Sequence, residues 1–473
     1  MNEEKKGIGL VALIALVVSS SIGSGVFAIV SDLASVAAPG AVILAWVIVG
    51  FGILMLAMSM SNLVDKRPDL EGIFAYAEEG FGPFAGFVSG WGYWLSAWLG
   101  NVAFATVMMS SIGYFFPIFK SGQNIESILV ASVVAWALTF IVNRGVESAA
   151  ILNTIVTVCK LIPLFVFIVI GIILFKGHIF TEMFWSNVHS SFKFGDVMSQ
   201  VKNCIMVMMW VFVGVEGAAM MSSRAKKKSD AGKATILGLL SLLLIYVLAS
   251  LLPYGYMTQA ELAKLNQPAM VYLFKDMIGS VGGGIISIGL IISILGAWLS
   301  WTMLPGETLM LMSKRNLVPK SFGKPNKYNA PTFALFLTQA LIQIFIFSLL
   351  FTTQAYNFAY SLCTAAIVIT YIFVAAYQVK YSWQQRGLQK DSIRQLIFGL
   401  IALIFEVVGI CLAGLQFLLL CFIAYVPGIF FYAKARREGG HAGLSKIEKL
   451  LSVFIVVGAI LSIVLLVVGV IKV

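Results

Sequence analysis

The chain has 473 residues, of which 60% are apolar and only 11% are charged, and its mean hydropathy is +0.96. Soluble domains average about 45–50% apolar and about 25% charged residues, so this composition excludes a water-exposed globular surface and indicates a chain dissolved in lipid. The net charge of +11 does not indicate a nucleic-acid partner, because the basic residues cluster between the apolar runs, where they set membrane topology.

Apolar runs long enough to cross a bilayer, which takes about 20 helical residues, recur along the whole chain. The thirteen candidates are 8–30, 40–64, 84–115, 126–142, 149–175, 199–222, 234–256, 280–312, 331–351, 355–379, 395–413, 415–433 and 448–471. They predict an all-α polytopic membrane protein with about 13 transmembrane helices. The loops between them are too short to form a soluble domain.

The basic residues keep step with these spans. Of the 32 Lys and Arg residues, 24 fall in the N-terminal tail and in alternate loops, seven fall on the opposite side, and one, Lys160, lies inside a span. Cytoplasmic loops are enriched in Lys and Arg. The pattern therefore predicts a multi-pass protein of the cell membrane with its N-terminus in the cytoplasm and its C-terminus outside.

The first and sixth spans contain small residues where a lipid-exposed helix would be weakened. Residues 19–27 read SSSIGSGVF, with Gly23, Ser24 and Gly25 in mid-span, and residues 210–217 read WVFVGVEG, with Gly214 past the middle. Paired interrupted helices point to an inverted-repeat transporter, in which half-helix N-termini face a carboxylate and freed carbonyls face an ammonium. The alternative is that these residues only permit close helix packing. The expected division is 1–175 for one five-helix half, 199–379 for the second, and 395–473 for additional helices.

Charged residues inside the membrane are costly and often functional. Lys160 is too far from either end of its helix to snorkel, so we expect it to place a cation beside the broken first span; the alternative is an ion pair with an intramembrane carboxylate. Glu216 follows the second break and is interpreted as a gate or coupling carboxylate, with partial snorkelling as the alternative. Glu406 lies outside the two halves and is interpreted as structural.

The third and eighth spans each carry a face of small, polar and aromatic residues. An indole can hold a cation, and an amide carbonyl can accept from an ammonium or guanidinium, so these faces are candidates for substrate contact. Packing in the core is the alternative for such a stripe. At helical spacing the residues are Tyr93, Ser96, Ala97, Gly100, Asn101 and Phe104 on the third span, and Ser293, Ala297 and Trp301 on the eighth.

Over residues 8–430 the sequence resembles the amino acid–polyamine–organocation superfamily, in its basic amino acid/polyamine antiporter branch. The resemblance rests on IGSGVF at 22–27, FGPF at 81–84, YWLSAWLGN at 93–101, the 210–216 segment and WT at 301–302. The 223–233 segment and the thirteenth span look most like arginine/ornithine antiporters. The arginine/agmatine antiporters lack the lysine found here at position 160 and carry a tyrosine where this chain has Phe74, which weighs against agmatine exchange and puts acid sensing at that position in doubt.

The resemblance implies a five-plus-five inverted-repeat fold and roles for individual residues. Gly23 and Gly214, at the two breaks, would belong to the substrate-binding site. Lys160 would stand where relatives hold sodium, and Tyr93 and Glu216 would belong to gates. The residues that would contact the substrate are Ile22, Ser24 and Gly25 at its carboxylate, Trp210 over its aliphatic part, and Ser96, Ala97, Asn101 and Trp301 around its distal cation.

The expected activity is exchange of arginine for ornithine by alternating access, without a cofactor or metal. Exchange of lysine with cadaverine, exchange of histidine with histamine, and proton-coupled import remain open, as does a homodimer. The sequence argues against a membrane enzyme, because its three histidines all lie in loops and its five cysteines lie inside apolar runs without CxxC spacing. No selectivity-loop repeat indicates a channel.

Overall fold

The protein is described here from a computed structural model that covers residues 7–186, 191–351, 355–413 and 415–471. These residues are almost entirely helical, and their only β-type pairing is an isolated bridge between Ile8 and Ala225. The helices of ten residues or more are α1 Leu10–Ser21, α2 Gly25–Ala34, α3 Pro39–Lys66, α5 Pro83–Ile112, α6 Ile125–Asn143, α7 Val146–Leu174, α9 Phe194–Val211, α11 Lys228–Leu251, α13 Ala269–Ile278, α14 Ser280–Lys314, α15 Thr332–Ser348, α16 Ala355–Gln384, α17 Ser392–Ala413, α18 Leu415–Glu438 and α19 Lys446–Val467.

Each of the thirteen predicted spans contains a helix or a helix pair. In the described part of the chain, ten helices are long and apolar enough to cross a membrane, and the bent pair α1–α2 makes eleven. The other two predicted spans correspond to α15, which is shorter, and to α9 with the short helix α10 Gly217–Met220. The protein is therefore an all-α polytopic membrane protein, and thirteen is an approximate count of its spans.

Four short helices lie where the sequence predicts only loops. They are α4 Phe74–Phe81, α8 Gly177–Glu182, α12 Gln259–Leu262 and α13. Each has at most ten residues, which is well below the length of a span, so hydropathy over a span-sized window does not detect them.

Local sequence explains where several helices begin. Pro39 and Pro83 occupy the first turn of α3 and α5, where a missing N–H costs nothing. At the start of α19 the Ser445 hydroxyl accepts from Glu448 N at 3.2 Å, and Glu448 Oε2 accepts from Ser445 N at 2.7 Å, which is a complete capping box.

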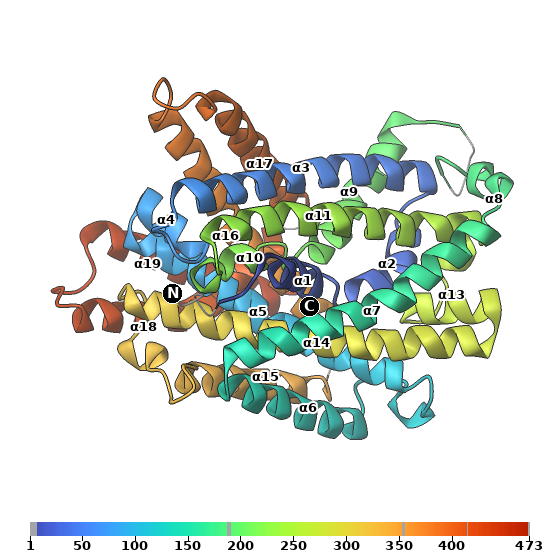
Figure 1. Ribbon diagram of the computed structural model, residues 1–473, viewed down its shortest axis with the longest axis horizontal. Helices are drawn as coiled ribbons and strands as arrows, with labels where there is room; N and C mark the ends of the chain where they lie inside the picture. The colour runs from blue at the N-terminus through green and yellow to red at the C-terminus, as the bar shows by residue number, and fades with distance from the viewer. Residues whose placement is uncertain (1–6, 187–190, 352–354, 414, 472–473) are drawn as a thin grey trace, which may run out of the picture.

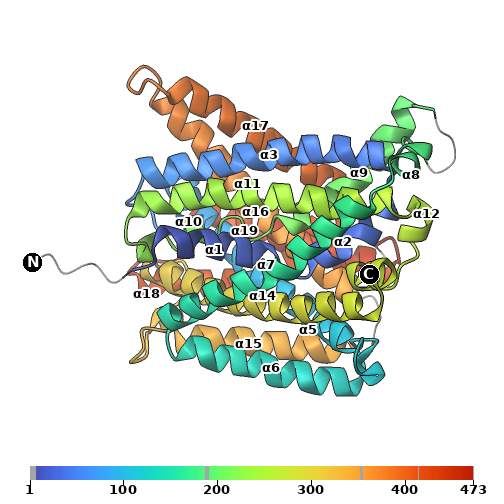
Figure 2. The ribbon, with the colours of Figure 1, turned by 45° about the vertical axis from the view of Figure 1, so that its right-hand side comes forward.

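The short helix α1 lies near the centre of the bundle. It packs against α7, α11 and α14, and α5 packs against α14 and α16 (Figure 1). Seen after a 45° turn, α3, α11, α7, α14 and α15 run along much the same direction around it (Figure 2). Because protein surrounds the break between α1 and α2, the backbone can leave its helix there without facing lipid.

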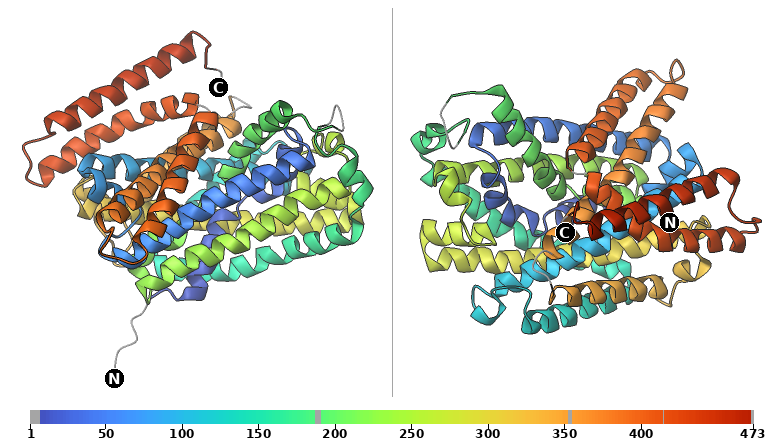
Figure 3. Two further views of the ribbon diagram at one scale, coloured as in Figure 1. Left: turned by 90° about the horizontal axis from the view of Figure 1, so that it is seen from above. Right: turned by 180° about the vertical axis from the view of Figure 1, so that it is seen from behind.

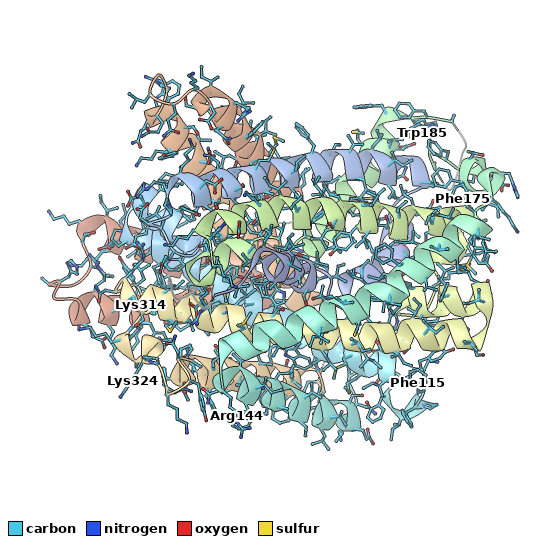
Figure 4. The ribbon with its side chains drawn as sticks, viewed as in Figure 1. Phe115, Arg144, Phe175, Trp185, Lys314 and Lys324 are labelled. Carbon is cyan, nitrogen blue, oxygen red and sulfur yellow. The ribbon has the colours of Figure 1, made fainter. Side chains whose placement is uncertain are left out.

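The last helices lie outside this centre. α18 packs against α19, and this hairpin lies along one outer side of the molecule when it is seen from above (Figure 3). Lys314, Lys324 and Arg144 lie toward the half of the bundle where the described chain begins, whereas Phe115, Phe175 and Trp185 lie toward the other end (Figure 4). We call the first of these the N-terminal end of the bundle.

Candidate functional site

Both predicted helix interruptions are present in the structure. α1 ends at Ser21 and α2 begins at Gly25, with a bend of 43° between them. α9 ends at Val211, and the chain becomes helical again only at Gly217. The sequence prediction of two broken spans is therefore confirmed.

The two breaks touch each other. The Ser20 hydroxyl donates to Gly214 O at 2.8 Å, and it also donates to Leu16 O within its own helix. Gly214 has φ +111°, and a Cβ there would lie 2.7 Å from the Ser20 carbonyl carbon. Only glycine allows both this backbone conformation and this approach, so Gly214 lets the two interrupted helices meet.

Lys160 stabilises the end of α1. Its side chain is completely buried, and Nζ donates to Ser19 O at 2.9 Å, to Ile22 O at 2.8 Å and to Ser19 Oγ at 3.1 Å. A cation at a helix C-terminus also compensates the negative end of the helix dipole. No carboxylate of the described residues forms a salt bridge with Lys160, so the ion-pair alternative is wrong.

Side chains of α14 bind the Ile22 carbonyl, which Lys160 also contacts, and one further carbonyl at the break. Ser293 Oγ donates to Ile22 O at 3.1 Å, and Trp301 Nε1 donates to Ser20 O at 2.8 Å. Asn101 in turn donates from Nδ2 to Trp301 O at 3.1 Å. Thus the broken segment is held by hydrogen bonds from α7 and α14 rather than by its own helix.

A small cavity of about 20 Å³ lies where the two breaks face α5, α14 and α16. Six of the predicted substrate-binding residues line it, namely Gly23, Ser24, Gly25, Ser96, Trp210 and Trp301. Four others do not. Ile22 and Gly214 lie in the breaks with their carbonyl groups hydrogen-bonded, Asn101 binds the Trp301 main chain, and Ala97 is buried in the surrounding core.

The cavity wall holds polar groups that have no hydrogen-bond partner. The hydroxyls of Ser21 and Ser24 are buried and unpaired, and both residues line the cavity. Ser24 precedes α2, whose first N–H groups have no acceptor within the helix. Buried polar groups normally find partners, so this arrangement is suited to a ligand with an acceptor such as a carboxylate.

The remaining wall is apolar or weakly polar. Trp210 and Phe104 pack so closely that a Cβ on Gly25 would lie 3.2 Å from Trp210 Nε1, and a Cβ on Gly23 would lie 2.6 Å from the Phe104 ring. On the facing side, Ser96 Oγ lies 3.2 Å from Cys363 Sγ. Gly100 and Phe104 lie on the predicted face of the third span but were not expected at the site. Ser20, Ser21, Val211 and Val213 lie in the two predicted breaks but were not predicted as site residues. Cys363 was missed, because a single cysteine in an apolar run gives no signal.

Glu216 links the second break to a neighbouring helix. It is fully buried, and Oε2 accepts from Gly214 N at 3.1 Å and from the Tyr371 hydroxyl of α16. The Tyr93 hydroxyl also lies beside this carboxylate. Full burial shows that the snorkelling alternative is wrong. Glu406 of α17 is also buried, and neither of its oxygens has a partner.

Beyond the cavity, toward the N-terminal end, a second set of contacts joins the chain's first residues to α10 and α14. Ile8 N donates to Arg224 O and Lys226 N donates to Ile8 O, both at 2.9 Å. The Arg224 guanidinium forms a 2.7 Å salt bridge with Glu307 of α14, which is only 3% exposed. These bonds hold the segment before α1 against the segment after α10 and obstruct this end of the bundle.

Arginines outside the spans also bind acidic residues at the same end. Hydrogen bonds from Arg67 lower the pKa of Asp69. Arg315 Nη1 lies 3.0 Å from Glu78 Oε2 and favours the charged carboxylate, but burial of Glu78 outweighs this and raises its pKa.

Comparison with known proteins places this geometry in context. A family model described as amino acid permease matches residues 8–441. An arginine/ornithine antiporter of Latilactobacillus sakei is 68% identical over 99% of both chains, and one of Lactococcus lactis subsp. cremoris is 49% identical over 93% of this chain and 86% of its own length. An arginine/agmatine antiporter of Chlamydia felis is 38% identical over 93% of this chain and 92% of its own length.

Proposed function

The chain belongs to the amino acid permease family, and from this premise we propose that it exchanges arginine for ornithine across the cell membrane by alternating access. The observation that carries the proposal is the cavity between two interrupted helices, with unpaired hydroxyls at one side and aromatic rings around it. The 68% identity to an antiporter named for these two substrates supports the choice of cationic amino acids.

In the proposed complex the substrate carboxylate binds at the start of α2. Ser24 and Ser21 supply hydroxyl donors there, and the first N–H groups of α2 add further donors and the positive end of the helix dipole. The α-ammonium faces the backbone of the second break near Val213, which lines the same cavity. Amines without a carboxylate would leave both hydroxyls unpaired, which favours ornithine over agmatine as the exchanged product.

The distal cation of the substrate extends toward Ser96, Cys363 and Trp301. The Trp301 N–H is already bound to Ser20 O, so the indole contributes its ring face, where a cation can gain up to about 2 kcal/mol. Trp210 lies beside Gly25 at the opposite wall and would cover the aliphatic part of the substrate. Both arginine and ornithine carry the required positive charge, which makes exchange of one for the other electroneutral.

The proposal divides the chain into two inverted halves, 1–175 and 199–379, followed by helices within 395–473. Each half begins with an interrupted helix, which supports this division. The basic residues at the N-terminal end of the bundle support a cytoplasmic N-terminus. In this orientation Glu216, Tyr93 and Tyr371 lie between the cavity and the cytoplasm, as a gate would.

Transport by reconstituted protein tests this function. Liposomes containing the purified protein are preloaded with ornithine, and uptake of labelled arginine, lysine, histidine and agmatine is measured. We expect saturable arginine uptake that requires internal ornithine, and weaker uptake of the other three. Arginine uptake without an internal counter-substrate would refute strict exchange, and uptake that does not saturate would indicate a channel.

A matched pair of variants tests the site within the same assay. Ser24→Ala removes an unpaired hydroxyl from the cavity wall. Ser241→Ala is the control, because it removes a hydroxyl on the exposed face of α11 that donates to Leu237 O within its own helix. The loss of one hydrogen bond to a charged group costs about 1.5–3 kcal/mol, so we expect arginine binding to weaken at least tenfold in the first variant. Equal arginine binding by the two variants would show that Ser24 does not bind the substrate carboxylate.

A further inference from the structure

A second and larger hollow lies away from the substrate cavity, between the corner of α4 and α5 and the helices α16, α18 and α19. It has a volume of about 620 Å³ and is lined mainly by apolar side chains, among them Phe84, Val88, Phe373, Phe422, Leu451 and Ile455. α19 packs against α18, and both α19 and α5 contribute residues to the wall of this groove. The α18–α19 hairpin lies at the outer side of the molecule (Figure 3), which in a membrane-spanning bundle is the side that meets lipid.

The groove has a polar end formed by Arg436, Ser445 and Glu448. This end lies at the loop joining α18 to α19, which is at the N-terminal end of the bundle (Figure 1). A second cation is close by, because Lys380 Nζ lies 5.6 Å from the centre of the Phe81 ring, which also lines the groove. The groove is therefore apolar along its length and polar at one end, where Arg436 and the nearby Lys380 bring two positive charges and Glu448 brings one negative charge.

Arg436 is the unusual residue at this end. Its Nε is buried and has no hydrogen-bond partner, and Arg436 forms no salt bridge with any residue that the structure describes. The nearby carboxylates have other partners: Glu448 accepts from the Tyr432 hydroxyl and from Ser445 N, and Glu78 pairs with Arg315. The charges of both carboxylates interact with Arg436, but neither forms a salt bridge with it, so the guanidinium is still able to pair directly with an anion.

We propose that this groove binds one anionic phospholipid, with the phosphate at Arg436 and an acyl chain along the apolar wall between α5 and α19. A guanidinium binds phosphate oxygens well, and a headgroup without its own cation gains most from this contact. A zwitterionic lipid offers the same chain but neutralises its own phosphate. Free phosphate offers the anion but leaves the apolar length of the groove unused. The bound lipid fills the gap between the α18–α19 hairpin and α5.

Native mass spectrometry of the purified full-length protein tests the headgroup contact. The protein is titrated with phosphatidylglycerol and, separately, with phosphatidylcholine of the same acyl chains. We compare Arg436→Gln with Arg437→Gln, which removes the same charge from an exposed position on the same helix. We expect Arg436→Gln to weaken binding of the anionic lipid about tenfold, which equals about 1.4 kcal/mol, and to leave phosphatidylcholine binding unchanged. Arg437→Gln should alter neither by more than about twofold.

Three outcomes of this titration would overturn the proposal. The first is equal loss in both variants, which would mean diffuse charge attraction. The second is equal binding of the two lipids by the unchanged protein. The third is displacement of the lipid by glycerol phosphate at the same concentration, which would mean that the site recognises only the anion.

A second pair of variants tests the apolar wall. Leu451→Trp adds bulk to the groove, whereas Val457→Trp adds it to an exposed position of α19 that does not line the groove. We expect the first to reduce binding of both lipids at least fivefold and the second to leave it unchanged, while both variants elute as a single sharp peak in size-exclusion chromatography, as folded protein does. Lipid binding that is unaffected by Leu451→Trp, or a dimer that Leu451→Trp dissociates, would show that the groove does not hold a lipid. Because lipid binding is measured without transport, failure of the proposed exchange activity would not be confused with failure of this proposal.

Discussion

Replacing Lys160 with methionine removes the cation at the first break while keeping a side chain of similar length. The ammonium makes hydrogen bonds to Ser19 O at 2.9 Å and Ile22 O at 2.8 Å. Ile22 O keeps its bond from Ser293 in the variant, so the main loss is at Ser19 O, which becomes a buried acceptor without this donor. A hydrogen bond to a charged group contributes about 1.5–3 kcal/mol. The variant no longer has to bury a charged ammonium, which offsets part of this loss. We therefore expect a free-energy cost in the lower half of that range.

The expected consequence is a weaker substrate site. If the unsupported break shifts away from its binding-competent form, the apparent affinity equals the intrinsic affinity multiplied by the fraction of molecules that remains competent. A cost of about 1.5–2 kcal/mol corresponds to an arginine affinity about 10–30 times lower. Titration calorimetry with arginine measures this directly, and Lys202→Met on the exposed side of α9 serves as a control for loss of a positive charge. Arginine affinity within twofold of the unchanged protein in Lys160→Met would refute the idea that this cation maintains the break.

Three further substitutions probe the site. Gly214→Ala places a Cβ 2.7 Å from the Ser20 backbone at a φ of +111°, so the exchange rate should fall at least tenfold. In the control Gly284→Ala the new Cβ meets its nearest atom at 3.7 Å, so this variant should transport normally. Equal exchange rates in the two variants would show that the breaks need not touch. Glu216→Gln keeps the shape of the gate but changes its bonding to Tyr371, so we expect slower exchange with arginine affinity changed less than threefold, and an unchanged rate would exclude a gating role. Trp301→Ala should weaken arginine binding about tenfold more than Trp98→Ala, measured by calorimetry, because only Trp301 lines the cavity; similar losses would contradict its placement beside the substrate.

Features that depend on neighbours in the sequence were predictable. The spans follow from apolar runs of sufficient length, and the two breaks follow from runs of glycine and serine that weaken a helix locally. Lys160 was predicted beside the first break because a lysine in mid-span must find a polar partner, and the freed carbonyls of a broken helix provide one. The short helices α4, α8, α12 and α13 were missed because they are too short for a hydropathy window.

Which side chains face the cavity was decided by tertiary structure. The side-chain carbonyl of Asn101 was expected at the substrate cation; the packing of α5 against α14 fixes the amide by a bond from its N–H to the Trp301 carbonyl and leaves Oδ1 buried without a partner. Tyr371 lies 155 residues from Glu216, and Cys363 lies 267 residues from Ser96, so neither pairing leaves a trace in local sequence. Hydrophobic periodicity specifies that a helix forms and which face is apolar, but the rotation and depth of one helix against another depend on the packing of all their side chains together.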